Sequence, residues 1–388
     1  AWEQRKLGEI ATETYGGGTP KTSNEEFWKG DIPWIQSSDL IDECLFDVRP
    51  RKCISQEAVS KSATKLVPQN SIAIVTRVGV GKLAFMPFSY ATSQDFLSLS
   101  GLKIDPEFTV YALYKMMQSV SNEVQGTSIK GVTKDELLAK KIIFPSCNEQ
   151  KKIGAYLHNL DNLITLHQRK CDNMKKIKKF MLQKMFPKKG EKFPEIRLEG
   201  FTDAWEQRKL GEVLKERTER AQGVEELLSV TIANGVIRQA DSEKRNIASE
   251  DKSNYKIVRK GDIPYNSMRM WQGAVGNSEY DGIVSPAYTV LVPTDEANAK
   301  FFMEYFKKEN SLQLFQRWSQ GLTSDTWNLK YPTLSSMRFS MPSIEEQNRI
   351  AEYFEQLDHL ITLHQRKSDV LKEMKKYMLQ NMFPDGRK

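Results

Sequence analysis

Six short loops of this sequence carry residue types that can read base edges in DNA. Arginine can hold guanine O6 and N7 with two hydrogen bonds, and glutamine or asparagine can do the same for adenine. Serine, threonine and lysine beside them suit phosphate oxygens. The candidate DNA contacts in the first half are Thr19, Lys21, Gln36, Ser37, Ser38, Arg77, Thr127, Ser128 and Lys130. Those in the second half are Asn266, Arg269, Trp271, Gln272, Arg317, Gln320, Thr323 and Ser324. An ordinary surface turn is the alternative for each loop, and a core position is the alternative for Trp271 and Trp318.

Composition agrees with a DNA ligand but does not require one. The 388 residues carry a formal net charge of +7, which attracts polyanions, although many proteins of this charge bind no nucleic acid. A length of this size predicts two or three domains, and no apolar run is long enough to cross a bilayer. The four cysteines show no CxxC spacing and are expected to be reduced thiols, so the expected location is cytoplasmic.

The chain contains a long internal duplication. Residues 1–9 return unchanged as residues 204–212, and Ile164–Lys170 returns as Ile361–Lys367, a shift of 197 (361 minus 164). Between the matched segments, residues 10–140 and 213–337 share little. Each copy is therefore a variable body followed by a nearly invariant tail, which indicates one scaffold with two specificities.

Each tail has the pattern of a long helix. Capping boxes at Ser146–Glu149 and Ser343–Glu346 predict the two starts, and Phe186-Pro187 and Phe383-Pro384 predict the two ends. Apolar residues between them recur at alternating steps of four and three, as in a coiled-coil seam. The expected helix-pair interface consists of Ile153, Leu157, Leu160, Ile164 and His167 in the first tail, and of Ile350, Phe354, Leu357, Ile361 and His364 in the second.

The two tails are expected to pack against each other in opposite directions. A helix over residues 149–185 is roughly 55 Å long, and the connection 187–203 could span that length only if it were fully stretched. Antiparallel pairing avoids this stretch and would place the two bodies at opposite ends of the pair. His167 and His364 would then lie near a pseudo-twofold axis, where a structural hydrogen bond is favoured over a metal or catalytic role.

Both bodies are predicted to be mixed α/β, which makes the whole chain an α+β protein. Strands are expected near residues 71–78, 96–104 and 140–144, a helix near 110–120, and their counterparts near 262–268, 288–292 and 300–308.

Three other functions are alternatives to DNA reading. A self-sufficient methyltransferase or nuclease would need an Asn/Asp-Pro-Pro-Tyr/Phe loop, a Gly-rich cofactor turn or clustered acidic metal ligands, and the sequence has none of these. Gly79–Lys82 lacks the pattern of a phosphate loop and predicts a tight turn. RNA recognition would need an aromatic strand or a Gly-x-x-Gly clamp in a suitable setting. A coiled-coil scaffold without intrinsic sequence readout remains open.

The chain closely resembles the specificity subunits of type I restriction–modification enzymes over essentially its whole length. The residues that carry the resemblance are the repeated Trp-Glu-Gln-Arg-Lys-Leu-Gly-Glu starts, Gly17–Lys21 before Phe27–Trp34, the Glu149-Gln150 and Glu346-Gln347 openings, and the two Leu-His-Gln-Arg-Lys tails.

The resemblance implies two target recognition domains joined by two antiparallel helices with pseudo-twofold symmetry, and a bipartite double-stranded DNA target with a spacer set by the helices. It also implies docking of two methyltransferase subunits and two restriction subunits. No cofactor is expected on this chain, because S-adenosylmethionine, ATP and Mg²⁺ would be bound by those partners. No catalytic or metal site is expected here either.

The predicted boundaries follow from the repeat. They are a first target recognition domain at 1–146, a central helix at 147–186, a linker at 187–203, a second target recognition domain at 204–342 and a distal helix at 343–388. Residues 193–203 precede the second copy and nothing precedes Ala1, so a short leader is expected to be missing from the first.

Overall fold

The computed structural model describes residues 2–125, 131–188, 190–223, 225–242 and 251–384. It divides into two compact units of similar size, and each long helix contributes to both. Unit 1 contains residues 1–168 and 366–388, and unit 2 contains residues 169–365. Among the described residues, no helix is apolar and long enough to span a bilayer.

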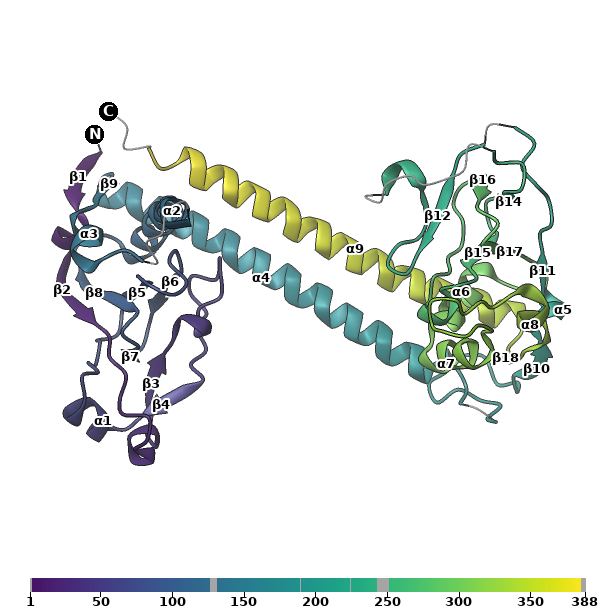
Figure 1. Cartoon of the computed structure of the whole chain (residues 1–388), viewed down its shortest axis with the longest axis horizontal. Helices are drawn as coiled ribbons and strands as arrows, with labels where there is room; N and C mark the ends of the chain where they lie inside the picture. The colour runs from purple at the N-terminus through teal and green to yellow at the C-terminus, as the bar shows by residue number, and fades with distance from the viewer. Residues whose placement is uncertain (1, 126–130, 189, 224, 243–250, 385–388) are drawn as a thin grey trace. The chain divides into compact units, whose positions relative to one another are not determined.

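Unit 1 is built on a four-stranded antiparallel sheet of order β2-β8-β5-β6, with a smaller sheet of order β4-β3-β7 and the two-stranded ladder β1-β9 (Figure 1). Its strands are β1 (Glu3–Lys6), β2 (Ala11–Gly16), β3 (Ile32–Ile35), β4 (Lys52–Ile54), β5 (Ser71–Val75), β6 (Leu83–Met86), β7 (Ala91–Thr92), β8 (Phe96–Leu102) and β9 (Lys141–Phe144). Its helices are α1 (Gln56–Lys61), α2 (Pro106–Gln125), α3 (Lys134–Ala139) and the first part of α4 (Cys147–Lys184), with short 3-10 turns η1 (Leu7–Glu9), η2 (Glu25–Trp28) and η3 (Ser37–Asp39).

Unit 2 repeats this plan with a three-stranded sheet of order β11-β17-β15 and the closing ladder β10-β18. Its strands are β10 (Glu206–Lys209), β11 (Leu214–Glu216), β12 (Leu228–Thr231), β13 (Gly235–Arg238), β14 (Lys256–Val258), β15 (Ile263–Asn266), β16 (Gly282–Val284), β17 (Tyr288–Pro293) and β18 (Arg338–Met341). Its helices are α5 (Leu210–Val213), α6 (Ala299–Lys307), α7 (Glu309–Trp318), α8 (Tyr331–Ser336) and the first part of α9 (Ile344–Asn381), with η4 (Gln239–Asp241) and η5 (Met270–Gln272). The strands and helices expected in both bodies are therefore present, within a few residues of the predicted bounds.

The duplicated starts of the two copies have the same structural role. Glu3 lies opposite Phe144 in the β1-β9 ladder, and Glu206 lies opposite Met341 in the β10-β18 ladder. Each ladder joins the first strand of a body to the strand that leads into a long helix, so the body is closed at the base of its helix.

The long helices begin and end where the sequence predicts, but the capping boxes are incomplete. Ser343 Oγ accepts a hydrogen bond from Glu346 N at 3.4 Å, which is half of the expected box. The Glu346 carboxylate does not return to the cap, because it binds the Arg197 guanidinium at 2.7 and 2.8 Å. In the described part of the chain, Ser146 Oγ accepts no bond from the first turn of α4. The prediction of two reciprocal boxes was therefore wrong, although the starts were correct.

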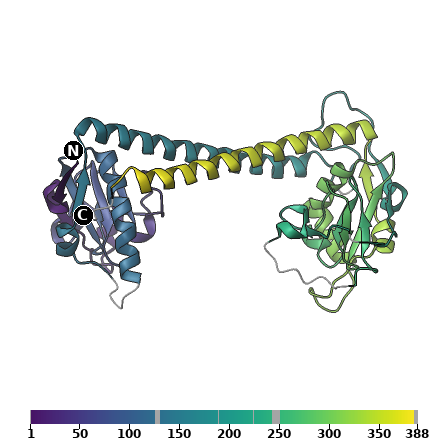
Figure 2. The same ribbon diagram turned by 90° about the horizontal axis from the view of Figure 1, so that it is seen from above.

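The two helices run in opposite directions within each unit, as expected (Figures 1 and 2). In unit 1, Asp161 of α4 binds Lys375 of α9 at 2.6 Å, and both the start of α4 and the end of α9 join one core cluster. In unit 2, Cys171 Sγ lies 3.7 Å from the Ile361 carbonyl, while Phe186 stacks on Phe354 further along. The predicted seam is buried at Ile153, Leu157, Leu160, Ile164, Ile350, Phe354 and Leu357, and half-buried at Ile361, His167 and His364.

Candidate nucleic-acid interface

The candidate loops of the first body emerge from one edge of the four-stranded sheet. β2 ends opposite the start of β8 (Gly16 pairs with Leu97), and β8 starts opposite the end of β5 (Phe96 pairs with Val75). The small sheet adds its own loop to this edge, because Ser93 N donates to the Ile35 carbonyl at 3.0 Å. Loops that are far apart in sequence are thus held side by side by backbone hydrogen bonds.

The glycine loop of the first body is fixed by close packing. A Cβ on Gly17 would lie 1.7 Å from the Ser93 carbonyl oxygen, so no larger residue fits there. The Gly18 carbonyl accepts hydrogen bonds from Trp34 Nε1 at 3.1 Å and Thr64 Oγ1 at 2.8 Å. This rigid segment leaves Thr19 and Lys21 exposed to solvent.

Four further candidates lie around the turn between β5 and β6. Gln36 N binds the Asp39 carboxylate at 2.9 Å, which shapes the 3-10 turn that carries Ser37 and Ser38. That turn packs near Gly79, where an added Cβ would be 3.8 Å from Ser37 Cβ. Arg77 begins the β5–β6 turn; it is exposed and makes no ion pair with any described residue. Gly79–Lys82 form the tight turn that the sequence predicts.

Some basic and polar residues at this edge carry no signal that would single them out in the sequence. Gln94 is exposed in the connection from β7 to β8, and Lys134 Nζ approaches Gly16. Arg51 donates to the Ser38 carbonyl at 3.0 Å and so supports the candidate turn. Thr127, Ser128 and Lys130 lie outside the described residues, although Val132 just beyond them donates to the Thr76 carbonyl at 2.9 Å.

In the second body, the two candidate loops lie together at the matching edge. Asn266 is the last residue of β15 and lies opposite Tyr288, the first of β17. Leu329 N donates to the Ser267 carbonyl at 2.9 Å, and Trp271 meets Trp327 edge to face at 5.1 Å. The loop that follows β15 and the loop that follows α7 are therefore packed on one another.

The side chains of these two loops differ in how they are held. Arg317, Gln320, Thr323 and Ser324 are exposed, whereas Asn266, Arg269, Trp271 and Gln272 are half-buried. Asn266 Oδ1 accepts from Met268 N, and Trp271 Nε1 donates to the Met268 carbonyl at 3.1 Å. Arg269 Nη2 lies 3.7 Å from the exposed Asp325 carboxylate, a weak pair that a stronger anion can replace. Trp318 is 53% exposed and is not a core residue.

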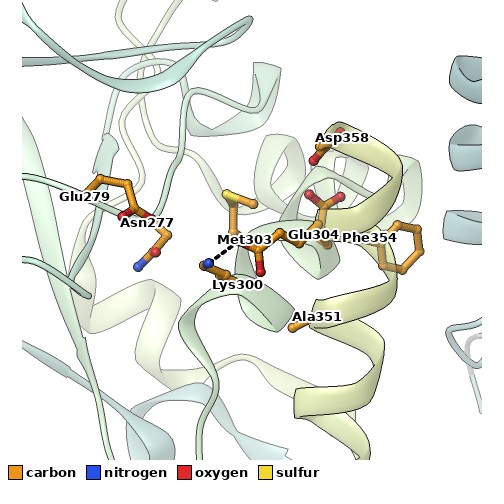
Figure 3. Close-up of a pocket in the computed structure, with 9 residues that line it drawn as sticks. Asn277, Glu279, Lys300, Met303, Glu304, Ala351, Phe354 and Asp358 are labelled. Atoms are coloured by element: carbon orange, nitrogen blue, oxygen red, sulfur yellow. Dashed lines mark hydrogen bonds and ion pairs between the residues drawn. The ribbon is translucent and has the colours of Figure 1, made fainter. Parts of the chain in front are cut away.

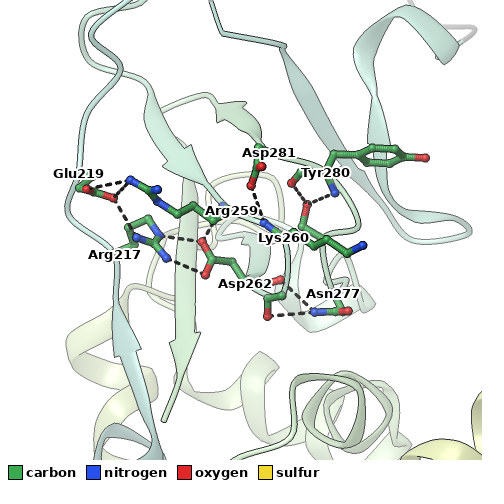
Figure 4. Close-up of polar contacts among 10 residues, drawn as sticks. Arg217, Glu219, Arg259, Lys260, Asp262, Asn277, Tyr280 and Asp281 are labelled. Carbon is green, nitrogen blue, oxygen red and sulfur yellow. Dashed lines mark hydrogen bonds and ion pairs between the residues drawn. The ribbon is translucent and has the colours of Figure 1, made fainter. Parts of the chain in front are cut away.

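Other arginines of the second body are committed to internal contacts. Arg217 donates two hydrogen bonds of 2.7 and 2.9 Å to the buried Asp262 carboxylate and one of 2.8 Å to Glu219 (Figure 4). The hydrogen bond to Asp262, opposed by desolvation, raises the pKa of Arg217. Arg259 shares Glu219 at 3.3 Å. These ion pairs hold the start of β15 in place, and they leave Arg269 and Arg317 better placed to meet an external ligand.

The same kind of hydrogen bond joins each body to its long helix, at positions that correspond in the two repeats. Gln150 Oε1 accepts from Asp105 N at 2.9 Å before α2, and Gln347 Oε1 accepts from Asn298 N at 3.0 Å before α6. Gln150 and Gln347 differ by the repeat shift, so each long helix is tied at the same point to the cap of the helix that follows the central sheet. A rigid connection of this kind fixes the direction in which each candidate edge points from its own helix pair.

A buried ion-pair cluster completes the junction in unit 2. Lys178 of α4 binds Asp358 of α9 at 2.7 Å and Glu304 of α6 at 2.9 Å, and Glu304 is 2% exposed. Burial raises the pKa of Glu304 against the opposing effect of Lys178. Burial alone would lower the pKa of Lys178, but Glu304 and Asp358 outweigh it and raise the value. A cavity of about 190 Å³ beside Glu304 and Phe354 belongs to this junction (Figure 3).

The family model described as the type I restriction modification DNA specificity domain matches residues 1–176 and 202–373. The chain is 30% identical over 230 residues to the MjaIX specificity subunit of Methanocaldococcus jannaschii, covering 55% of this chain and 52% of that protein. It is 34% identical over 172 residues to the EcoR124I/EcoR124II specificity subunit of Escherichia coli, covering 42% and 41%. In these matches the chain spans about half the length of each relative, or less.

A solved structure shares the fold over the whole chain. The type I restriction–modification S subunit from M. genitalium covers 100% of this chain and is covered over 97% of its own, with a TM-score of 0.65 and 16% identity. The match to a DNA specificity family supports the expectation that this chain is a non-catalytic component. With the two matched stretches falling on the two sequence repeats, the chain belongs to the type I restriction–modification DNA specificity family.

Proposed function

We propose that this chain reads a bipartite sequence in double-stranded DNA, with one half-site for each body and a spacer set by α4 and α9. One observation carries the proposal: in each body, loops with side chains of types that can read bases emerge at the same edge of the central sheet. Clustered arginine, glutamine and asparagine side chains give the paired donors and acceptors that direct readout needs. Exposed lysine, serine and threonine beside them suit phosphate contacts.

The catalytic steps belong, in this proposal, to two methyltransferase and two restriction subunits that dock on the chain. S-adenosylmethionine, ATP and Mg²⁺ would be bound by those partners. Within the described ranges, no group of three or more His, Cys, Asp or Glu residues is arranged to hold a metal ion. Docking on the helices is supported by large apolar side chains that the helix pair leaves exposed. In unit 1 they are Tyr156, Leu163, Leu166, Val370, Met374 and Tyr377, and in unit 2 Ile177, Phe180 and Leu360.

Selection from a random DNA pool tests the proposal. The chain, assembled with its methyltransferase subunits, should enrich two short defined sequences separated by a fixed number of undefined base pairs. A scaffold whose bodies bind only protein would enrich no motif. Enrichment of a single continuous motif would contradict the bipartite part of the proposal while leaving DNA recognition intact.

Arginine substitutions should relax base choice in one half-site at a time. Arg77→Ala is expected to alter only the half-site of the first body, and Arg269→Ala only that of the second. Each should cost about 1–3 kcal/mol on the preferred sequence if the arginine holds a guanine with two bonds. Arg77→Lys keeps the charge but not the two-bond geometry, so it should lose discrimination in the same way. An equal loss on every sequence would assign the residue to phosphate instead.

DNA affinity should fall steeply with salt because bound counterions are released when the protein contacts phosphate. For six to ten phosphate contacts, the loss between about 50 and 200 mM salt is roughly 10³–10⁵-fold. The slope of log K against log salt, measured by fluorescence anisotropy, checks this, and Lys21→Ala should reduce the slope by about one contact. A flat profile would argue against DNA as the ligand.

A further inference from the structure

The loop between α7 and α8 presents one leucine at the tip of a fixed turn. Gln320 and Asn328 close the loop with two backbone hydrogen bonds of 3.0 and 2.8 Å. Inside it, Thr323 N donates to Thr326 Oγ1 at 3.1 Å, and Thr326 N donates to the Thr323 carbonyl at 3.0 Å. Leu322 lies in this turn with a relative exposure of 101%, so its side chain is fully exposed to solvent.

The backbone beside Leu322 is specialised for this presentation. Gly321 has φ +149°, which L side chains rarely adopt, and a Cβ there would lie 2.6 Å from the Thr326 carbonyl oxygen. No larger residue therefore fits at position 321 while the turn keeps this conformation. Single exposed apolar residues are common on protein surfaces, so exposure alone would not assign a role. The position and the neighbours of this leucine are the further evidence.

The two repeats share a short Gln-Gly and Thr-Ser pattern at this point. The first body reads Gln125-Gly126-Thr127-Ser128, and the second reads Gln320-Gly321-Leu322-Thr323-Ser324. Leu322 separates the two halves of this four-residue match, and the residues that follow Thr-Ser differ between the repeats. Residues 126–130 lie outside the described residues, so this comparison concerns sequence alone.

The surroundings of Leu322 indicate which ligand it meets. Arg317, Gln320, Thr323 and Ser324 are exposed around it and offer hydrogen bonds to a polar, anionic surface. An aliphatic side chain among such groups can pack on an apolar part of a polar ligand, and the faces of stacked bases provide one in DNA. Proteins that kink DNA use leucine, isoleucine or phenylalanine wedges between base pairs in this way.

We propose that Leu322 inserts between two base pairs of the half-site read by the second body and opens that step. This inference rests on the proposed function. The second body would then select its half-site partly by how easily one step unstacks, which favours flexible pyrimidine–purine steps.

The test uses the chain assembled with its methyltransferase subunits and the bipartite site obtained from pool selection. The half-site whose base choice changes in Arg269→Ala identifies the DNA of the second body. Duplexes carrying 2-aminopurine at successive positions of that half-site report unstacking as a rise in fluorescence. The wild-type complex should give a rise at one step that depends on Leu322, separate from any signal of a base flipped by the methyltransferase, which should persist in the variants.

Deletion of Leu322 is the matched variant, because it recreates the Gln-Gly-Thr-Ser segment of the first body. This deletion and Leu322→Ala should abolish the fluorescence rise and weaken binding about tenfold, whereas Leu322→Phe should retain both. On a duplex with a mismatch at the same step, the loss should shrink to about twofold or less, because the step is already open and unstacking costs less. Ile232→Ala changes another exposed apolar residue of unit 2 and should behave as wild type.

Two results would overturn the wedge without touching the proposed function. One is wild-type binding to the bipartite site with no Leu322-dependent fluorescence at any position. The other is a Leu322→Ala chain that keeps its affinity for DNA but loses its methyltransferase subunits on size-exclusion chromatography, which would make the leucine a protein contact. If the wild-type complex selects no DNA sequence at all, the proposed function itself fails.

Discussion

Insertion of one heptad into both long helices should lengthen the spacer of the recognised site by about three base pairs. Seven residues add about 10.5 Å to a helix, and duplex DNA advances about 3.4 Å per base pair. The insertion belongs after Gln168 and after Gln365, where both helices pass from one unit to the other at repeat-related positions. Every contact within either unit is then kept, and a seven-residue step keeps the phase of the seam.

The expected effect on the original site is large. Once the spacing is wrong, only one half-site can be engaged at a time, so the advantage of linked binding is lost and affinity should fall by about 10²-fold or more. The longer spacer also turns one half-site by about 100° around a duplex with roughly 10.5 base pairs per turn. We therefore expect the new optimal site to bind more weakly than the original one does to the wild type.

Pool selection with spacers of variable length measures this result directly. Both half-site sequences should be unchanged, because the residues that read them are untouched. In a control variant the same seven residues replace the heptad that follows the insertion point, so the helix length does not change. This variant should keep the original spacer. If the inserted chain still selects that original spacer, the helices do not set the distance.

Lys178→Met should destabilise unit 2 by about 3 kcal/mol at neutral pH. Lys178 is 17% exposed and compensates Glu304, which is 2% exposed and has no other partner for its second carboxylate oxygen among the described residues. Removing one member of a buried ion pair leaves the other charge unpaired at low dielectric, and such changes typically cost about 3–5 kcal/mol. The lower figure applies because Asp358 is half-exposed and can turn to water.

The loss should shrink as the pH falls. Burial raises the folded-state pKa of Glu304 above its unfolded value. A carboxyl group shifted in this direction favours the folded state when it is protonated and loses that contribution as the pH rises through the folded pKa. Without Lys178 the upward shift of the Glu304 pKa becomes larger, so the variant should approach wild-type stability as the pH is lowered.

Native-state hydrogen exchange of the α6 amides measures this effect within unit 2 alone. Lys179→Met is the matched control on the same helix, and because Lys179 is exposed it should change stability by no more than about 0.5 kcal/mol. Lys375→Met removes the related lysine of unit 1 and should cost less, because Asp161 keeps a 2.6 Å hydrogen bond from Tyr111. Equal stability of Lys178→Met and Lys179→Met at pH 8 would refute the ion-pair account.

The two copies use different residues at the junction between the body and the long helices. Tyr111 of α2 donates a hydrogen bond to Asp161 of one Lys–Asp pair, whereas Glu304 of α6 accepts a hydrogen bond from Lys178 of the other. Burial, followed by the nearby Asp161 charge, raises the pKa of Tyr111, so the phenol stays protonated and donates. The invariant tails thus accept two different body helices, which is how one scaffold can carry two bodies of different sequence.

The sequence by itself determined the repeat, the two long helices and their antiparallel pairing. These features depend on local rules and on chain connectivity: a heptad seam marks the buried face of a helix, proline ends it, and residues 187–203 are too short for a relaxed parallel return. The residue types that read bases were also visible, because arginine, glutamine and asparagine stand out in loops rich in glycine and serine.

Only the tertiary structure decided which loops lie together and which charged groups are already occupied. Arg217 and Arg269 have the same chemistry in the sequence, but the fold commits Arg217 to the buried Asp262 and leaves Arg269 with a weak surface partner. The lysines at seam positions 178 and 375 follow the apolar period, and nothing local predicts that each meets an aspartate from the other helix. The two lysine–aspartate contacts join residues more than a hundred positions apart, so they depend on helix packing, which local sequence patterns do not specify.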